Sequence, residues 1–356
     1  MGEGPMGEGW IPAQPEKPER EVRKQLPDSM VTTVIRFLRL PLLLSLLLCG
    51  CKPFVLEPVP DWAYPTNPAP PSGQAAPVAP QGPFHIETSK LSFTRPELTN
   101  LFAAPDWRPE DHPALPEIVS HGRKPEVRAC AYCHLPTGNG RPENARLAGL
   151  PVEYFVAQMK AFRDGTRTSF VVGRAPTINM TNTAKAIQDE EILAAARYFA
   201  ALPPRSFVRV VESSLIPKSK IAGWLFKFDR QGGQDPLGQR IIEGPEDFDQ
   251  FELRDPATPY IAYVPEGSIA LGKRLAETWG EQKELECSSC HGPGYRGKDA
   301  VPSLAGRSPT SVVRQLYDMK SGARHGGKSS EMDKVVKYMK NSDMLALAAY
   351  LGSLTP

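Results

Sequence analysis

Apolar residues recur three and four positions apart in two late segments of the chain, Asp189–Leu202 and Ser342–Leu354. Each segment begins with a helix-capping type of residue and carries acidic residues in or near its first turn, where they stabilise a helix N-terminus. The pattern therefore predicts an amphipathic helix in each segment. A third helix is predicted over Ser268–Trp279, and a shorter one around Pro116–Gly122.

A different pattern fills residues Ser206–Glu266. Short stretches rich in β-branched and aromatic residues alternate there with Gly and Pro, as in short strands joined by turns. These stretches are Phe207–Val211, Trp224–Phe228 and Tyr260–Val264. The segment is therefore expected to form hairpins or irregular structure. It contains no motif that indicates a catalytic or binding function.

An apolar run near the start of the chain, Met30–Cys51, has the layout of a secretory signal. Arg36 and Arg39 precede about nine apolar residues, too few to span a bilayer. Its end, Leu48-Cys49-Gly50-Cys51, resembles a bacterial lipoprotein box, in which the last cysteine is lipidated and becomes the mature N-terminus. Cys49 does not fit that part, because bulky Leu48 would sit at the cleavage position. The alternative is an ordinary buried or membrane-surface helix.

The segments on either side of this signal are poor in apolar residues. Residues 1–29 are polar and rich in Gly and Pro, and we expect translation to start at Met30. From Pro53 to Pro83 roughly every third position is a proline, which favours extended polyproline conformation. At about 3.1 Å per residue, this stalk would reach up to roughly 90 Å and bring a tethered domain to neighbouring membrane partners.

An internal repeat organises the rest of the chain. Adding 157 to a residue number carries the first of two Cys-x-x-Cys-His motifs onto the second and also aligns a Leu-Ala-Gly segment. The aligned residues are Cys130/Cys287, Cys133/Cys290, His134/His291, Pro136/Pro293, Gly140/Gly297, Leu147/Leu304, Gln158/Gln315, Gly165/Gly322 and Arg167/Arg324. Further on the offset falls to 152, which aligns Met180/Met332, Ala196/Ala348 and Tyr198/Tyr350. The first copy therefore has a loop five residues longer.

Composition and charge exclude some classes of function. Lys plus Arg number 42 and Asp plus Glu number 40 in 356 residues, so no basic surplus favours nucleic-acid binding. Prolines number 38, about twice the usual share, which indicates that part of the chain is not packed domain. No uninterrupted run of 18 or more apolar residues predicts a spanning helix in the mature protein.

The six cysteines form three close pairs, and two of these pairs read Cys-x-x-Cys-His. This is the attachment sequence for c-type haem: two thiols form thioethers with the vinyl groups, and the adjacent histidine is the proximal iron ligand. Three alternatives compete: a zinc site, a thioredoxin-like redox pair and structural disulfides. Each motif supplies at most three zinc ligands, no βαβ pattern surrounds the cysteines, and a disulfide would leave both histidines unexplained.

The repeat also nominates a sixth ligand for each iron. Met180 aligns with Met332, whereas every other methionine of one copy meets a different residue type in the other. A single methionine is most often a core filler, but this symmetry favours the ligand role. Methionine together with histidine raises the reduction potential of a haem relative to two histidines.

Other residues carry weaker signals. His85, His112, His121 and His325 have no counterpart under the repeat. We interpret His121 and His325 as surface or structural residues, with a rival ligand or a propionate contact as the alternative. Arg167 and Arg324 do correspond, and each is either a solvated surface arginine or the partner of a haem propionate.

Together, the twin Cys-x-x-Cys-His motifs, the Leu-Ala-Gly segments, the later methionine and the closing helices resemble class I cytochromes c, most of all the two-domain dihaem kind. The resemblance covers roughly residues 116–204 and 267–356. It implies a mainly α fold with two tandem small all-α domains, each wrapped around one covalently bound haem c. This sequence departs from the family pattern at three places. Leu135 stands where the second copy has Gly292, the helix before Cys130 is short and proline-rich, and the segment between the copies is long.

These expectations give a domain plan and a set of site residues. The plan is an upstream extension over residues 1–29, a lipoprotein signal over 30–50, a Pro-rich linker over 51–83, cytochrome domains over 84–204 and 267–356, and an inter-domain segment over 205–266. The expected haem-attaching and ligand residues are Cys130, Cys133, His134 and Met180, and Cys287, Cys290, His291 and Met332, with Cys51 lipidated.

The expected function is electron transfer between exported or membrane-bound redox proteins by a lipid-anchored cytochrome on the periplasmic side of a bacterial membrane. The alternatives are a dihaem enzyme, such as a peroxidase or a thiosulfate-oxidising cytochrome, and the cytochrome subunit of a membrane dehydrogenase. A cysteine iron ligand is excluded, because four cysteines attach haem, Cys51 carries lipid and Cys49 leaves with the signal. A matched methionine in both copies favours the carrier.

Overall fold

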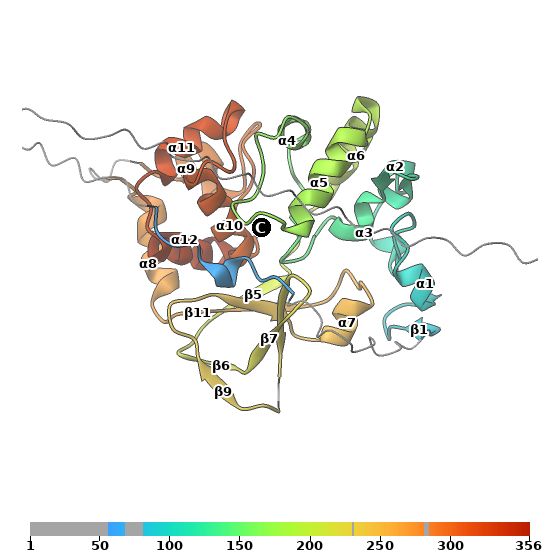
Figure 1. Cartoon of the computed structure of the whole chain (residues 1–356), viewed down its shortest axis with the longest axis horizontal. Helices are drawn as coiled ribbons and strands as arrows, with labels where there is room; N and C mark the ends of the chain where they lie inside the picture. The colour runs from blue at the N-terminus through green and yellow to red at the C-terminus, as the bar shows by residue number, and fades with distance from the viewer. Residues whose placement is uncertain (1–55, 68–80, 230, 281–284) are drawn as a thin grey trace, which may run out of the picture. The chain divides into compact units, whose positions relative to one another are not determined.

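The computed structural model describes residues 56–67, 81–229, 231–280 and 285–356 (Figure 1). The predicted upstream extension, signal peptide and lipidated Cys51 lie outside the described residues. Within the described residues, no helix is long and apolar enough to cross a membrane.

Helices account for most of the regular structure. The α-helices are α1 Arg95–Leu98, α2 Glu117–Ser120, α3 Cys130–His134, α4 Val152–Arg163, α5 Ala175–Ala186, α6 Asp189–Ala201, α7 Phe248–Glu252, α8 Ser268–Glu277, α9 Ser288–His291, α10 Pro309–Lys320, α11 Ser330–Val336 and α12 Asn341–Ser353. The short 3-10 helices are η1 Asp61–Ala63, η2 Pro109–Asp111, η3 Pro293–Tyr295 and η4 Gly327–Ser329. The predicted helices correspond to α6, α12, α8 and α2, with ends within two residues of the expected ones.

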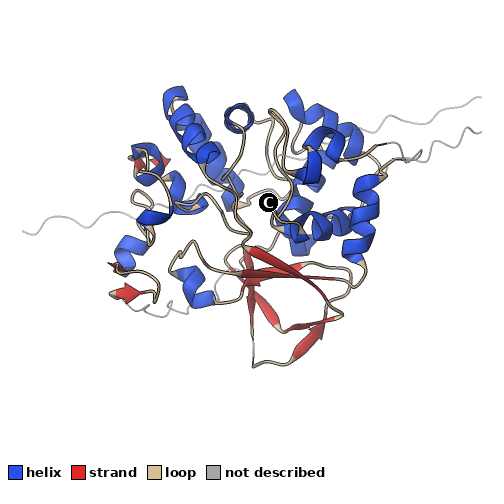
Figure 2. Ribbon diagram, turned by 180° about the vertical axis from the view of Figure 1, so that it is seen from behind, coloured by secondary structure: helices blue, strands red, loops and turns tan. Residues whose placement is uncertain are grey.

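The strands are short, and most of them come between the two copies of the repeat in the sequence. Most of the strands, drawn red, lie below the helices in Figure 2. The strands are β1 Phe84–His85, β2 Ser92–Phe93, β3 Gly122–Arg123, β4 Val127–Arg128, β5 Val208–Glu212, β6 Leu215–Pro217, β7 Ser219–Ala222, β8 Leu225–Phe228, β9 Gln234–Pro236, β10 Ile242–Pro245 and β11 Tyr260–Val264. Three of them form a sheet in the order β10-β11-β5, in which β11 is antiparallel to β10 and parallel to β5.

This sheet corrects the expectation for residues 205–266. The predicted stretches do form strands β5, β8 and β11, and β7 and β8 make a hairpin. The parallel pairing of β5 with β11 was not expected, because it joins the two opposite ends of this segment. The chain therefore leaves the first copy and enters the second along neighbouring strands.

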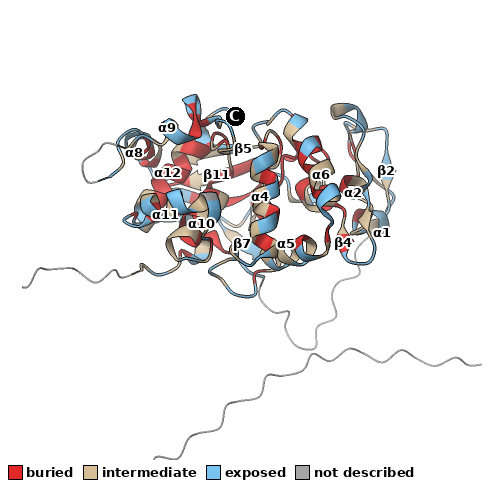
Figure 3. Cartoon of the chain, turned by 90° about the horizontal axis from the view of Figure 1, so that it is seen from above, coloured by how far each residue is buried: buried red, intermediate tan, exposed pale blue. Residues whose placement is uncertain are grey.

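Each copy of the repeat packs its helices on its own apolar core. In the first copy α2, α4 and α6 surround buried Phe155, Met159 and Phe199. In the second copy α8 crosses α12 so closely that a Cβ on Gly272 would lie 1.9 Å from the Ala346 carbonyl oxygen. Helix α12 is buried along most of its length (Figure 3).

The sequence repeat is also a repeat of backbone hydrogen bonds. Gly149 N donates to Phe199 O at 3.0 Å, and Gly306 N donates to Leu351 O at 2.8 Å. Further pairs, related by the offset of the cysteine motifs, are Gly140 N to His134 O and Gly297 N to His291 O, and Leu147 N to Gly138 O and Leu304 N to Tyr295 O. The two copies therefore share one local architecture around their cysteine motifs.

The longer loop of the first copy reaches over the second. Thr168 N donates to Ala323 O at 2.7 Å, and Phe170 N donates to Asp318 Oδ1 at 2.9 Å. The Phe170 ring meets Tyr317 edge-on at 5.2 Å, and Val171 packs against the core of the second copy. Residues 168–171 of this loop, here called the arm, thus join the first copy to the second.

The predicted extended stalk is wrong for part of the linker. Residues 56–67 lie against the second copy, where Ala63 and Tyr64 are buried. Residues 68–80 are outside the described residues. The proline content predicted an extended stalk. The apolar residues between the prolines instead pack against the core of the second copy.

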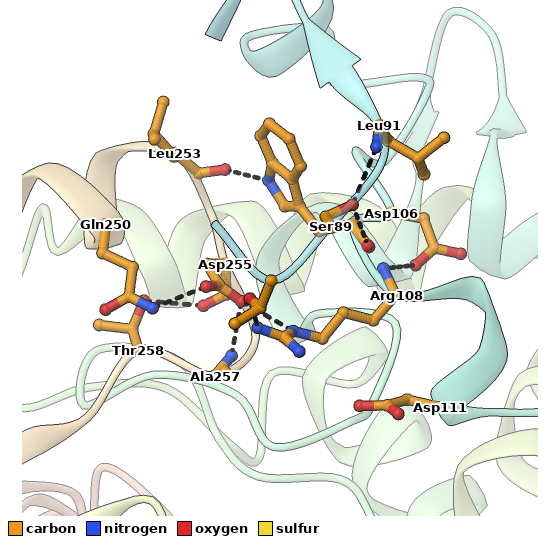
Figure 4. Close-up of polar contacts among 12 residues, drawn as sticks. Ser89, Leu91, Asp106, Arg108, Asp111, Gln250, Leu253, Asp255, Ala257 and Thr258 are labelled. Atoms are coloured by element: carbon orange, nitrogen blue, oxygen red, sulfur yellow. Dashed lines mark hydrogen bonds and ion pairs between the residues drawn. The ribbon is translucent and has the colours of Figure 1, made fainter. Parts of the chain in front are cut away.

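A polar cluster attaches the start of the first copy to the inter-copy segment (Figure 4). Arg108 Nε pairs with Asp255 Oδ1 at 3.3 Å, and Gln250 Nε2 donates to Asp255 Oδ2 at 2.6 Å. Beside them, Trp107 Nε1 donates to Leu253 O at 2.7 Å. Asp255 is 1% exposed, so these donors stabilise a buried carboxylate.

Candidate haem-binding sites

In each copy, one helical turn carries the cysteine motif. Cys130, Cys133 and His134 lie on α3, and the equivalent residues of the second copy begin at the N-cap of α9 and end at its last residue. Residues three apart on a helix share one face, so both sulfurs of a pair face the same side. The four cysteines are free, which does not support the disulfide alternative.

The residue after each motif histidine turns the chain sharply. Gly292 has φ 76°, and Leu135, which replaces glycine in the first copy, has φ 63°. A Cβ on Gly292 would lie 2.3 Å from the Gly297 carbonyl oxygen. The departure at Leu135 therefore keeps the turn, at the cost of a conformation that side-chain-bearing residues rarely adopt.

The motif histidines are held in one tautomer. His134 Nδ1 lies 2.8 Å from Ala145 O, and His291 Nδ1 lies 2.9 Å from Pro302 O. A carbonyl oxygen only accepts, so Nδ1 carries the hydrogen and Nε2 keeps a free lone pair for a metal. Ala145 and Pro302 are again equivalent under the repeat, although neither was singled out from the sequence.

Burial favours the neutral forms of the motif side chains. It lowers the pKa of both His134 and His291, so both imidazoles are neutral at pH 7. It also raises the pKa of the Cys130 thiol to about 12 and that of Cys287 to about 11.

Within the described residues, no group of three or more His, Cys, Asp or Glu is placed to hold a metal ion, which gives the zinc alternative no support.

Each nominated methionine borders the same core as its motif. Met180 lies on α5, half-buried, and packs with Cys130 against the core of the first copy. Met332 lies on α11, half-buried, and packs with Cys287 against the core of the second. Each methionine therefore borders the core of its own copy, and its role as an iron ligand stays a prediction.

Arg167 and Arg324 meet at the seam between the two copies, where their backbones form a bridge. Arg167 donates to Gln158 Oε1 at 2.8 Å and to Gln315 Oε1 at 3.0 Å. Arg324 donates to the same two oxygens at 3.0 and 2.7 Å. With Arg324 only 5% exposed and Arg167 half-buried, the solvated-surface interpretation is wrong. The repeat itself brings the two arginines face to face.

Two more arginines join this seam cluster, defined as Arg146, Arg167, Arg307 and Arg324. Arg146 donates to Ala305 O at 2.8 Å and to Gly306 O at 3.0 Å, and Arg307 donates to Ser303 O. In the part of the chain that the structure describes, no ion pair joins any of the four to a carboxylate. The cluster is therefore a concentration of positive charge whose hydrogen-bond acceptors are neutral.

The positive charge of the seam cluster shifts the pKa values of neighbouring side chains. Burial alone would raise the pKa of Tyr154, but Arg324 and Arg167 outweigh it and lower that pKa to about 8. Burial, together with the charge of Arg324, lowers the pKa of Arg167 to about 9. A site of this kind favours a bound anion such as a carboxylate.

The remaining histidines lie outside the motif cores. His121 and His325 are exposed, and His325 Nδ1 contacts Gly322 O at 2.8 Å. His112 Nε2 pairs with Asp106 Oδ2 at 3.1 Å, and His85 is exposed on β1. These placements fit the surface or structural interpretation.

Comparison with known proteins agrees with the site. The sequence model of the cytochrome c family matches residues 269–355. The cytochrome subunit of sulfide dehydrogenase from Chlorobaculum tepidum is 31% identical over 83 residues, and the match covers 23% of this chain and 73% of that protein. The chain belongs to the cytochrome c family.

Longer matches cover about two thirds of this cytochrome. The thiosulfate dehydrogenase electron acceptor of Thiomonas intermedia is 26% identical over 234 residues, 64% of this chain and 80% of that protein. Cytochrome c4 of Azotobacter vinelandii is 24% identical over 234 residues, 64% of this chain and 86% of that protein. Thiosulfate dehydrogenase from Marichromatium purpuratum matches in structure with a TM-score of 0.44 and 27% identity, over 65% of this chain and 38% of that one.

The cytochrome is thus a mainly α class I c-type cytochrome that binds haem covalently, and its function is electron transfer. The family match covers the second copy only, so the likeness of the first copy rests on the sequence repeat and the shared hydrogen bonds. The sequence analysis did not identify the carbonyl partners of the two histidines, nor the hydrogen bonds of Gln158 and Gln315 to the arginines. The repeat alignment nevertheless pairs Ala145 with Pro302 and Gln158 with Gln315.

Proposed function

We propose that the two copies are tandem class I cytochrome c domains, each carrying one covalently attached haem c. Cys130 and Cys133 would attach the first haem, with His134 and Met180 as iron ligands. Cys287 and Cys290 would attach the second, with His291 and Met332 as iron ligands. Haem c supplies a one-electron redox couple. The observation that carries the proposal is the twin Nδ1 hydrogen bond, which leaves Nε2 of both histidines free.

The chain's own residues set the properties of each site. The carbonyls of Ala145 and Pro302 fix the tautomer and orientation of the histidines, as partners of metal-bound imidazoles commonly do. Methionine sulfur is a soft ligand that raises the potential of haem iron. Two such sites suit a carrier that takes electrons from donors and passes them to more oxidising acceptors.

The seam cluster supplies positive charge between the domains. Haem carries two propionate carboxylates, and Arg167 and Arg324 would be their partners, because the hydrogen-bond acceptors of both guanidinium groups are neutral. Because the same arginines join Gln158 to Gln315, the two domains would be held as one body. A fixed distance and orientation between the two haems would support repeated one-electron transfer between them.

We favour a carrier over an enzyme because both domains present a half-buried methionine in a matching position, which would close the sixth coordination site of both irons. The relatives named as electron acceptors or as a subunit of a dehydrogenase support redox proteins as partners, including a dehydrogenase that donates electrons. A peroxidase-like enzyme would need one open iron. A periplasmic location and a lipid anchor on Cys51 complete the proposal and rest on the signal sequence.

The haem stoichiometry and the coordination of each iron test this proposal together. Two haems per chain are expected from the pyridine haemochrome assay and from intact mass. The oxidised protein is expected to show a methionine–iron absorption band whose intensity corresponds to both haems. One haem per chain, or a band corresponding to only one, would overturn the dihaem carrier in this form.

A further inference from the structure

Residues Leu56–Asn67, here called the strap, dock on the second copy of the repeat although the whole first copy separates the two in the chain. Tyr64 donates from its hydroxyl to Asp318 Oδ1 at 2.8 Å. Arg314 Nη1 donates to Ala63 O at 2.8 Å, and Tyr317 donates from its hydroxyl to Glu57 O at 2.7 Å. Three residues of α10 therefore hold the strap.

Other elements hold both ends of the strap. Asn341, the first residue of α12, donates from its backbone to the Glu57 carboxylate and from Nδ2 to Pro58 O at 2.8 Å. At the far end, Gly223 N donates to Asn67 Oδ1 at 2.8 Å. The strap is thus attached from its second residue to its last.

Apolar burial stabilises this docking. Ala63 is 0% and Tyr64 3% exposed, and Leu56, Val59 and Trp62 pack against the core of the second copy. Burying one large apolar side chain contributes about 1.5–3 kcal/mol, and each net hydrogen bond contributes about 1 kcal/mol. These contacts offset the cost of ordering the segment, which its prolines reduce.

The docked strap changes what the predicted lipid anchor can do. Cys51 and Glu57 are six residues apart, and an extended chain spans at most about 3.6 Å per residue, so they lie at most about 22 Å apart. The proline-rich residues 68–80 come after the strap. They connect it to the first copy at Gln81 and add nothing to the distance between the anchor and the docked strap.

We propose that the strap makes the second copy the membrane-proximal domain, its α10 and α12 side tethered close to a bilayer by this short connection. The partner is the lipid surface in which the acyl chains of Cys51 would insert, so the inference rests on the proposed lipidation. The arm and the seam cluster fix the first copy to the second, so it does not swing outward on the linker. The second haem domain is then the one placed to exchange electrons with a membrane-bound partner.

Two insertions of one Gly/Ser sequence, about 30 residues long, test this placement. One follows Lys52, between the anchor and the strap, and the other follows Gln74, between the strap and the first copy. A coil of that length adds about 30 Å of average reach. Energy transfer from a headgroup-labelled donor lipid to haem, measured on vesicles, reports the distance from the bilayer.

The insertion after Lys52 is expected to lower energy transfer severalfold, whereas the insertion after Gln74 leaves it unchanged. Replacement of Tyr64 by alanine, which loosens the strap, should give a smaller decrease that Tyr64→Phe largely avoids. Equal decreases from both insertions, or none from either, in protein shown by intact mass to be acylated, would overturn the strap. Absence of acylation would overturn the membrane placement while leaving the dihaem function, which the haem count tests separately.

Discussion

Arg167 and Arg324 occupy equivalent positions in the two copies and meet each other across the seam, where each donates to both Gln158 and Gln315. This is the geometry of a two-fold interface, in which one surface contacts its own equivalent. Here both surfaces belong to one chain. The contact thus joins the two copies of the repeat and concentrates positive charge where they meet.

Replacing Arg324 by glutamine should lower at least one of the reduction potentials, by tens of millivolts. Removing a buried cation near a haem stabilises the more positive, oxidised iron relative to the reduced iron. Spectroelectrochemical titration would measure both potentials. Arg205→Gln is the matched control, because Arg205 is an exposed residue that pairs with Asp111 away from the seam. Unchanged potentials in the Arg324 variant would contradict the assignment of the seam cluster to the propionates.

Replacing Met180 or Met332 by alanine should leave both haems attached, because the thioethers do not depend on the sixth ligand. The expected change is loss of half the methionine–iron band and a lower potential at one haem. Met319→Leu is the control, since Met319 borders the same core as Met332 but has no counterpart in the first copy. A variant that keeps the full band would show that its methionine is not the ligand.

Glu243 should make stability depend on pH. It lies 1% exposed on β10 and accepts hydrogen bonds from Ser308 and from both the backbone and hydroxyl of Thr310, at the start of α10. Burial raises the pKa of Glu243 above its ordinary 4.5. The folded protein therefore retains a proton that the unfolded chain has lost, so the free energy of unfolding falls as pH rises from 4.5 to the raised pKa.

Glu243→Gln keeps the acceptor oxygen and removes this titration. Denaturant unfolding of the holoprotein at pH 5 and pH 8 is expected to show a smaller loss of stability with pH in the variant than in the parent. Glu252→Gln, at an exposed site on α7, should follow the parent. Parallel pH profiles for Glu243→Gln and the parent would mean that Glu243 is ionised in the fold throughout this range.

The sequence predicted best what depends on short spacing. Helices α6, α8 and α12 were predicted because their apolar faces repeat locally. The residues expected to attach haem could be nominated because each motif is contiguous, and their role stays a prediction. The strap and the β5–β11 pair were missed because their partners are distant in the chain, and local patterns do not specify a partner. A solvated surface position was one of the two interpretations of Arg324 for the same reason, since its burial depends on the other copy.

Gly292→Ala should destabilise the second copy of the repeat. The added Cβ would lie 2.3 Å from the Gly297 carbonyl oxygen, in a residue with φ 76°. The conformation alone costs about 1–3 kcal/mol, and the clash adds to it. Gly322→Ala separates the two contributions, because Gly322 has φ 78° with no atom within 4 Å of its added Cβ. Thermal unfolding should rank the parent above Gly322→Ala and that above Gly292→Ala; equal losses would show that the turn relaxes to accept the Cβ.

The purified dihaem protein should exchange electrons with small cytochrome or membrane-complex donors without turning over hydrogen peroxide or thiosulfate. Methionine at the sixth position of both irons would leave neither open to a small substrate, and the expected chemistry of both domains is the same. The Met180→Ala variant provides an internal standard, because an opened iron should react with peroxide more readily than the parent does. Stopped-flow reduction and steady-state assays of both proteins would measure this. Substantial turnover by the parent, comparable to that of the opened variant, would favour the enzyme over the carrier.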